Sequence, residues 1–152
     1  MFHKILYPTD FSDVSAKGLA FVERLQEAGT MEVVVLHVID LRHFDALLSH
    51  DSTFRVKAIV ASLETAALDK LNAVADSLRN KGFTVKVRLG KGIPFHEILK
   101  AADQEGVSAI VIGSHGVSNV EEMFLGSVSE KVIRKSKQTV LVVKREETTK
   151  KP

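Results

Sequence analysis

Short segments of the chain carry apolar residues in patterns that predict strands. Residues 3–7 are rich in Ile, Leu and Tyr, and nearly continuous apolar runs lie at residues 31–39, 107–112 and 139–143. Residues 83–89 alternate Val with Lys and Arg. Continuous runs are typical of strands covered on both faces, and alternation is typical of a strand with one exposed face. The sequence therefore predicts a largely buried sheet.

The segments between these runs repeat apolar residues every three or four positions, which predicts amphipathic helices. The first expected helix is capped by Ser12 or Asp13 and ends at Gly29. The second has its apolar side at residues 63–78 and stops at Gly82, and the third begins at Pro94 and ends at Gly106. The last begins at Gly126 and Ser127. Residues 40–54 have no clear period and predict a loop or a ragged helix. Strand and helix alternate, which predicts parallel strands joined by right-handed crossovers.

The expected fold class is α/β, a single three-layer domain around a five-stranded parallel sheet. A chain of 152 residues, 45% hydrophobic and 26% charged, is long enough for one sizeable core. We expect this domain to span residues 1–145 and a polar tail to occupy residues 146–152.

Charge and composition narrow the function classes. Lys and Arg number 21 against 19 Asp and Glu, a net charge of +2, which gives little support to nucleic-acid binding. The chain has no cysteine, so disulfides, thiolate metal sites and cysteine nucleophiles are excluded. No apolar run has the length of a membrane span, and the first residues lack the apolar stretch of a signal peptide. We expect a cytoplasmic protein that binds neither nucleic acid nor membrane.

Two segments are candidates for a binding site, because ligands of such sheets bind beyond the carboxyl ends of the strands. One is Pro8-Thr9-Asp10, after the first strand, and the other begins at Gly113, after the fourth. The second has the spacing Gly113, two residues, Gly116, nine residues, Gly126-Ser127. We expect Gly113 to leave room for a ribose or phosphate, and Gly116 to take a positive φ that turns N–H groups toward one concavity.

The start of the last helix suits an anion. Its first turn has unpaired N–H groups and the positive end of the helix dipole. Hydroxyls of Ser127 and Ser129 can add donors. The spacing of glycines and serines therefore predicts a phosphate cradle formed by Gly113, Gly116, Gly126, Ser127, Val128 and Ser129.

This glycine spacing resembles the nucleotide-binding signature of the ATP-binding branch of the universal stress protein family. The likeness extends along the chain through KILYPTDFS, LHVID, GIPFHEIL and KSKQTVLVVK. The family's fold is Rossmann-like and adenine nucleotide α-hydrolase-like, which implies the strand order 3-2-1-4-5. The resemblance also implies ATP or another adenine nucleotide as ligand.

The resemblance assigns roles to further residues. It implies that Asp10 binds the ribose, that Pro8 and Thr9 shape its loop, and that backbone groups near Val38 and Ile112 hold the adenine. It also implies that the last strand, residues 139–143, lies at a sheet edge, where pairing with a second copy would give a homodimer.

Each of these residues has a structural alternative. Glycines after strands commonly serve turns alone, and Asp10 can cap the first helix, although Ser12 and Asp13 are better placed to do so. His115 can reach a phosphate or polarise water, or it can simply face solvent, so we assign it to ligand binding and name no catalytic residue. Glu121 and Glu122 can hold Mg or Mn against the phosphates, or form a solvated loop face. No histidines have the spacing of a metal site on a helix or ribbon.

The sequence favours binding over turnover. No P-loop motif occurs, because Gly90-Lys91-Gly92 lacks the preceding glycine and the following hydroxyl residue. The glycine loop also lacks a Lys or Arg to neutralise a phosphoryl transition state. We expect a nucleotide-dependent regulatory or stress-response switch. The alternatives are a slow ATP hydrolase that needs a divalent metal or a partner, and an interaction module with a vestigial pocket.

Overall fold

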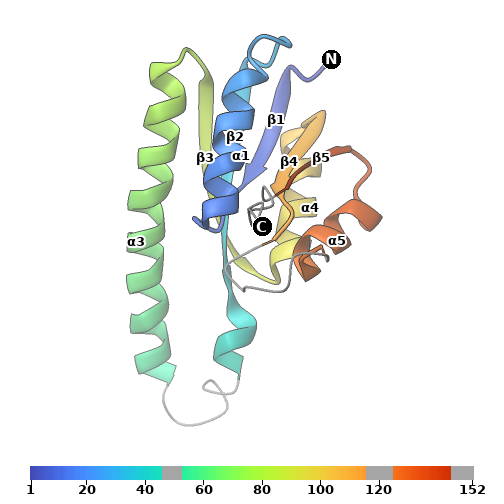
Figure 1. The fold of residues 1–152 in the computed structure, drawn as a ribbon. Helices are drawn as coiled ribbons and strands as arrows, with labels where there is room; N and C mark the ends of the chain where they lie inside the picture. Colours follow the sequence, from blue (N-terminus) through green and yellow to red (C-terminus); the bar gives the residue numbers. More distant parts are fainter. Residues whose placement is uncertain (46–52, 116–124, 145–152) are drawn as a thin grey trace, which may run out of the picture.

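The fold is known from a computed structural model, which describes residues 1–45, 53–115 and 125–144. All of its strands run parallel in one sheet of order β3-β2-β1-β4-β5 (Figure 1). The strands are β1 Lys4–Pro8, β2 Glu32–Asp40, β3 Thr84–Gly92, β4 Ala109–Gly113 and β5 Thr139–Val143. The predicted fold class and strand order are confirmed.

Helices cover both faces of the sheet. They are α1 Asp13–Arg24, the short 3-10 helix η1 Leu41–Phe44, α3 Thr53–Asn80, α4 Pro94–Glu105 and α5 Ser127–Lys135. Alternate residues of β1 show the two layers: Ile5 packs with α1 and α3 residues such as Val22 and Leu71, and Leu6 packs with Ile98 of α4 and Val132 of α5. This alternation explains the continuous apolar runs, since both faces of the central strands are buried.

The first helix ends earlier than its apolar pattern suggests. Ser12 is the N-cap, as predicted, and its side chain accepts from the N–H of Ser15. The α-helix stops at Arg24, and the chain continues to Gly29 through hydrogen bonds that join residues three apart. Gly29, with φ 93°, ends this segment, and the Thr30 N–H closes back on the Leu25 carbonyl. The glycine stop is therefore right, but the last turns are not α-helical.

The strand β3 is longer than its alternating pattern predicts. It continues through Gly90, Lys91 and Gly92 because these residues pair with the last three residues of β2. The strand β1 ends earlier, at Pro8 opposite Leu36. The last part of β2 therefore extends past β1, which opens the carboxyl end of the sheet on that side.

The bounds of β5 agree with the prediction, and β5 lies at one edge of the sheet. The expected tail at 146–152 lies outside the described residues. In the described part of the chain, no helix has the length and apolar character needed to cross a membrane.

Candidate functional site

A pocket of about 740 Å³ opens at the carboxyl ends of the strands. This volume lies within the range of small-molecule sites, roughly 300–1,000 Å³. Its walls come from the loop after β1, the ends of β2 and β4, the first turns of α4 and α5, and part of α3. The pocket therefore lies where the topology of a parallel α/β sheet predicts a ligand.

The sequence-predicted site residues come together in this pocket. The lining includes Pro8, Thr9, Asp10, Val38, Ile112, Gly113, His115, Gly126, Ser127, Val128 and Ser129. Gly116, Glu121 and Glu122 lie outside the described residues.

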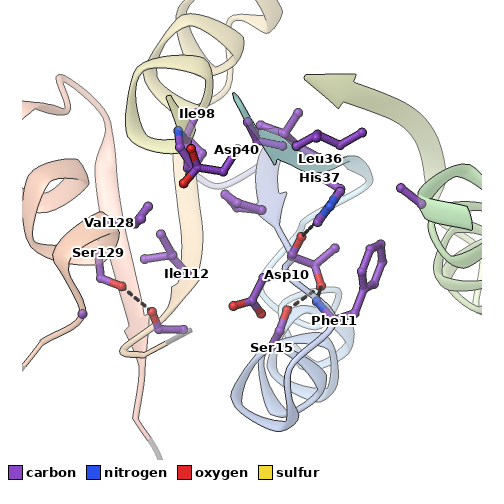
Figure 2. Close-up of a pocket in the computed structure, with 18 of the residues that line it drawn as sticks. Asp10, Phe11, Ser15, Leu36, His37, Asp40, Ile98, Ile112, Val128 and Ser129 are labelled. Carbon is purple, nitrogen blue, oxygen red and sulfur yellow. Dashed lines mark hydrogen bonds between the residues drawn. The ribbon is translucent and has the colours of Figure 1, made fainter. Parts of the chain in front are cut away.

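Hydrogen bonds from both backbone and side chains fix the loop that carries Asp10. The Thr9 N–H donates to the Leu36 carbonyl at 2.8 Å, and Nδ1 of His37 donates to the Thr9 carbonyl at 2.8 Å. Oδ1 of Asp10 accepts from the Ser12 N–H at 3.0 Å. Asp10 thus has the structural role that the sequence offered as an alternative, because it supports the chain at the start of α1. It also lines the pocket. Figure 2 shows its carboxylate directed toward the side of the pocket where Ile112 lies.

Phe11 has an unusual backbone for a residue with a side chain. Its φ is 62°, in the left-handed region that non-glycine residues seldom adopt. Its N–H donates to Oγ1 of Thr9 at 3.1 Å, and its ring lies 4.7 Å from that of His37. The Lys70 ammonium group lies 5.3 Å from the centre of the Phe11 ring. This conformation turns Phe11 to the opposite side of the loop from the Asp10 carboxylate (Figure 2).

Gly113 is required by packing within the protein. A Cβ atom at this position would lie 2.9 Å from Cγ1 of Val14, which is fully buried in α1. Packing is thus a second reason for this glycine, beside the room for a ligand that its place at the end of β4 predicts. The close approach of α1 to the end of β4 already excludes a side chain.

Ser129 and Ser127 have different roles. The Ser129 hydroxyl is buried and donates to the Gly113 carbonyl at 2.7 Å, which ties α5 to the end of β4. It is therefore not a free donor for a ligand, contrary to the sequence-based prediction. Ser127 lies at the first position of α5, after the N-cap Gly126. Gly126 has no side chain to accept from the first-turn N–H groups, so this helix start suits an anionic ligand.

His115 is held by its neighbour and does not face solvent at Nε2. Its Nδ1 lies 2.8 Å from Oγ of Ser114, which is 3% exposed. The Nε2 atom is buried, and it has no hydrogen-bond partner among the residues that the structure describes. A buried ring nitrogen without a partner is costly, and a polar ligand atom can satisfy it.

Asp40, at the end of β2, is a lining residue that sequence reasoning missed. Its carboxylate accepts from Nε of Arg42 at 2.9 Å and from Nη2 of Arg42 at 2.5 Å. Hydrogen bonding to Arg42 holds the pKa of Asp40 below its ordinary value. The carboxylate is therefore ionised and can only accept hydrogen bonds near neutral pH.

No cluster of three or more His, Asp or Glu side chains placed to hold a metal ion occurs within residues 1–45, 53–115 and 125–144. The features that fit a nucleotide are the uncapped start of α5, the buried His115 nitrogen and the Asp10 side chain on the loop after β1. Together these groups suit a ligand with an anionic end and hydroxyl donors.

A parallel sheet covered by helices on both faces, with a pocket at the carboxyl ends of its strands, defines a Rossmann-like α/β protein. The chain belongs to the universal stress protein family, whose model matches residues 1–144. It is 40% identical over 156 aligned positions to the universal stress protein MJ0577 of Methanocaldococcus jannaschii, covering 95% of this chain and 96% of that protein. It is 34% identical to YxiE of Bacillus subtilis, covering 95% and 100%. The family assigned from the sequence is confirmed.

Solved structures agree with this assignment. The structure of MJ0577 matches with a TM-score of 0.88, covering 97% of this chain and 99% of that chain. Two more distant universal stress proteins, each 22% identical, share the fold with TM-scores of 0.63 and 0.60. The first was solved in complex with cAMP, and the second, from Archaeoglobus fulgidus, in complex with dAMP.

Proposed function

We propose that this chain is an ATP-binding universal stress protein that acts as a nucleotide-dependent switch, with little or no intrinsic hydrolysis. The observation that carries the proposal is that the Asp10 carboxylate and the uncapped start of α5 border the same pocket (Figure 2). A nucleoside triphosphate has hydroxyl donors at one point and an anionic chain at another, which matches this pair of features.

The base would bind along the free part of β2. The Leu36 carbonyl is directed toward β1, where it accepts from the Thr9 N–H. Because backbone groups of a strand alternate between its two neighbours, the N–H and C=O of Val38 are directed the same way, past the end of β1. The Val38 N–H and C=O are thus a donor and an acceptor side by side, which suits the edge of adenine, where a ring nitrogen accepts beside a 6-amino group that donates. The apolar side chains of Ile98 and Ile112 can pack on its faces.

The sugar and phosphates would then extend toward α5. The Asp10 carboxylate can accept from ribose hydroxyls. Backbone N–H groups and the Ser127 hydroxyl at the helix start can donate to phosphate oxygens, with the helix dipole favouring the negative charge. The buried Nε2 of His115 can contribute a further polar contact.

Slow turnover is part of the proposal. Among the described lining residues, Lys70 is the one Lys or Arg, and its ammonium group lies over the Phe11 ring. Phe11 is on the other side of the loop from the Asp10 carboxylate (Figure 2). Phosphoryl transfer depends on cations at the transferring group. Hydrolysis would therefore need a divalent ion such as Mg or Mn bound through the phosphates, or a cation from a partner.

Assembly and ligand class complete the proposal. The edge strand β5 pairs only with β4 within the described structure, and its side chains from Val140 to Val143 are half-buried. A second copy joined at this edge would cover them.

Adenine nucleotides in the two distant family structures support the ligand class. A cytoplasmic location, expected from the sequence, belongs to the same proposal.

Calorimetric titration of the nucleotide-stripped protein with ATP and magnesium tests the function, with ADP measured in the same samples. We expect saturable binding and almost no ADP over hours. Ser127→Glu adds a negative charge at the helix start and should weaken ATP binding by at least about tenfold. The control Ser62→Glu adds the same charge at an exposed position of α3 outside the pocket, and should leave binding unchanged. Steady ADP release by the parent would show that the protein is an ATP hydrolase, and would contradict the proposed switch.

A further inference from the structure

Asp40 lies on the face of β2 that borders the base side of the pocket. Leu36 and Val38 both pack in the core between the sheet and α4, and Asp40 follows Val38 by two residues on the same face. Figure 2 shows the Asp40 carboxylate on the Ile98 side and directed away from His37. The Asp40 side chain is 17% exposed and lines the pocket.

The carboxylate is fixed in place. Arg42 donates to both of its oxygens through the guanidinium group, and the Arg42 N–H donates to Oδ1 at 3.1 Å. Nε2 of His43 lies 3.6 Å from Oδ2. Each carboxylate oxygen has two lone pairs. Within the described part of the chain, Oδ1 accepts from both Nε and the N–H of Arg42, whereas Oδ2 accepts from Nη2 alone, so Oδ2 retains acceptor capacity. Asp40 therefore offers a rigid acceptor to whatever lies beside it.

The direction of β2 decides which part of a base lies nearest to Asp40. Along β2 the N–H of Val38 lies nearer to Leu36 and its C=O lies nearer to Asp40. A base acceptor that bonds to the N–H therefore lies on the Leu36 side, and a base donor that bonds to the C=O lies on the Asp40 side. The rise of a strand separates the Cα atoms of Val38 and Asp40 by about 7 Å. An amino group that donates one hydrogen to the Val38 carbonyl has its second hydrogen free, on the Asp40 side.

We propose that Asp40 is a specificity-determining residue that selects purines with an amino group at position 6 over purines with an oxygen there. The inference rests on the proposed function and refines it. A 6-amino group can donate to the fixed carboxylate. A 6-oxo group would place its lone pairs against that negative charge, which is unfavourable in a partly enclosed site.

Affinities for ATP and ITP, which differ in this group, test the proposal. The parent should bind ATP more tightly than ITP by at least about tenfold. Asp40→Asn keeps an acceptor oxygen and adds an amide donor, so it should tighten ITP binding and reduce the ATP preference several-fold. The Val38 backbone discriminates equally in both proteins, so the change in the ATP-to-ITP ratio isolates Asp40. A gain in ITP affinity cannot come from a folding defect.

The control is Asp76→Asn, which removes a charge from another Asp–Arg pair, on α3 and outside the pocket. It should leave the ATP-to-ITP ratio unchanged. An unchanged ratio in Asp40→Asn, with ATP still bound by the parent, would overturn the role of Asp40 alone. A folded parent that binds neither nucleotide would overturn the proposed function, and the role of Asp40 with it.

Discussion

Gly113 and Val14 are so close that a Cβ atom on Gly113 would lie 2.9 Å from Cγ1 of Val14. Val14 is fully buried at the start of α1, and Gly113 is the last residue of β4. The contact therefore joins the two segments that carry opposite sides of the pocket. The absence of a side chain at Gly113 is a condition for α1 to lie this close to the sheet.

The first prediction follows from this contact. Gly113→Ala should lower the free energy of unfolding by about 1–3 kcal/mol, because the added methyl group overpacks a buried site. Urea denaturation followed by circular dichroism measures the effect. In the double variant with Val14→Ala, space is restored, so the combined loss should be smaller than the sum of the single losses by about 1 kcal/mol. Additive losses would mean that the contact does not limit this position.

The second prediction concerns the ribose. Asp10→Asn keeps an oxygen that can accept from the Ser12 N–H, so the loop should persist. The loss of charge should weaken ATP binding by roughly fivefold to tenfold, because a hydrogen bond to a charged group exceeds a neutral one by about 1–1.5 kcal/mol. Binding of 2′,3′-dideoxy-ATP, which lacks the hydroxyls, should not change. If both ligands lose affinity equally, Asp10 does not act through the ribose.

The third prediction concerns pH and Glu105, which lies at the end of α4. Its carboxylate accepts from Lys86 at 2.8 Å and from Arg88 at 2.9 Å, and its side chain is 7% exposed. Hydrogen bonding to Lys86, aided by Arg88, holds the pKa of Glu105 below its ordinary value of 4.5, against the effect of burial. A lowered pKa stabilises the fold above the ordinary value, and this contribution is lost as the pH falls through the folded-state pKa.

Glu105→Gln should therefore cost about 1–3 kcal/mol of unfolding free energy at pH 7. The difference from the parent should shrink as the pH falls below 4.5. Unfolding curves at several pH values measure this. Glu64→Gln is the control, because Glu64 pairs with Lys91 at a more exposed site and should contribute less than about 1 kcal/mol. A constant difference across the pH range would contradict the assignment.

The fourth prediction concerns assembly. Leu141 is half-buried in the edge strand β5, and a lysine there would place a charge in the proposed interface. Leu141→Lys should convert a dimer to a monomer in light scattering coupled to gel filtration. Lys86→Leu in β3, at the opposite edge of the sheet, should leave the dimer intact. A parent that is monomeric at high concentration would contradict the β5 interface.

The fold could be predicted from the sequence to a large extent. Continuous apolar runs such as residues 31–39 arise because both faces of the central strands are covered, and the alternation of strand and helix then permits few topologies. The end of α1 could not be predicted from its apolar pattern, since the chain continues through residues 25–29 in tighter turns, where Leu25 is buried and residues 27–29 are exposed. Tertiary contacts, rather than local preference, decide such boundaries.

The candidate site could be predicted only where its residues follow one another at strand ends. Asp10 and Gly113 have that signal, whereas Phe11 reaches the lining through a left-handed backbone that no local pattern indicates. Lys70 joins it because α3 packs across the sheet. The predicted strand stops at residue 39, one residue short of the end of β2. With that residue included, strand alternation would place Asp40 on the same face as Val38. The contact between Gly113 and Val14 depends on the packed structure alone.

The most direct test of the account is an ATP titration followed by the backbone amide signals of the isotope-labelled protein. We predict that the amide signals of Val38, Ser127 and Val128 shift until ATP saturates the site. The amides of Lys86, near the start of β3, and Glu105, at the end of α4, lie away from the pocket and should not shift. Adenosine should shift Val38 but leave Ser127 nearly unchanged, because it lacks phosphates. Pocket amides that stay fixed at saturating ATP, or shifts confined to the far end of the sheet, would contradict an ATP site at the carboxyl ends of the strands.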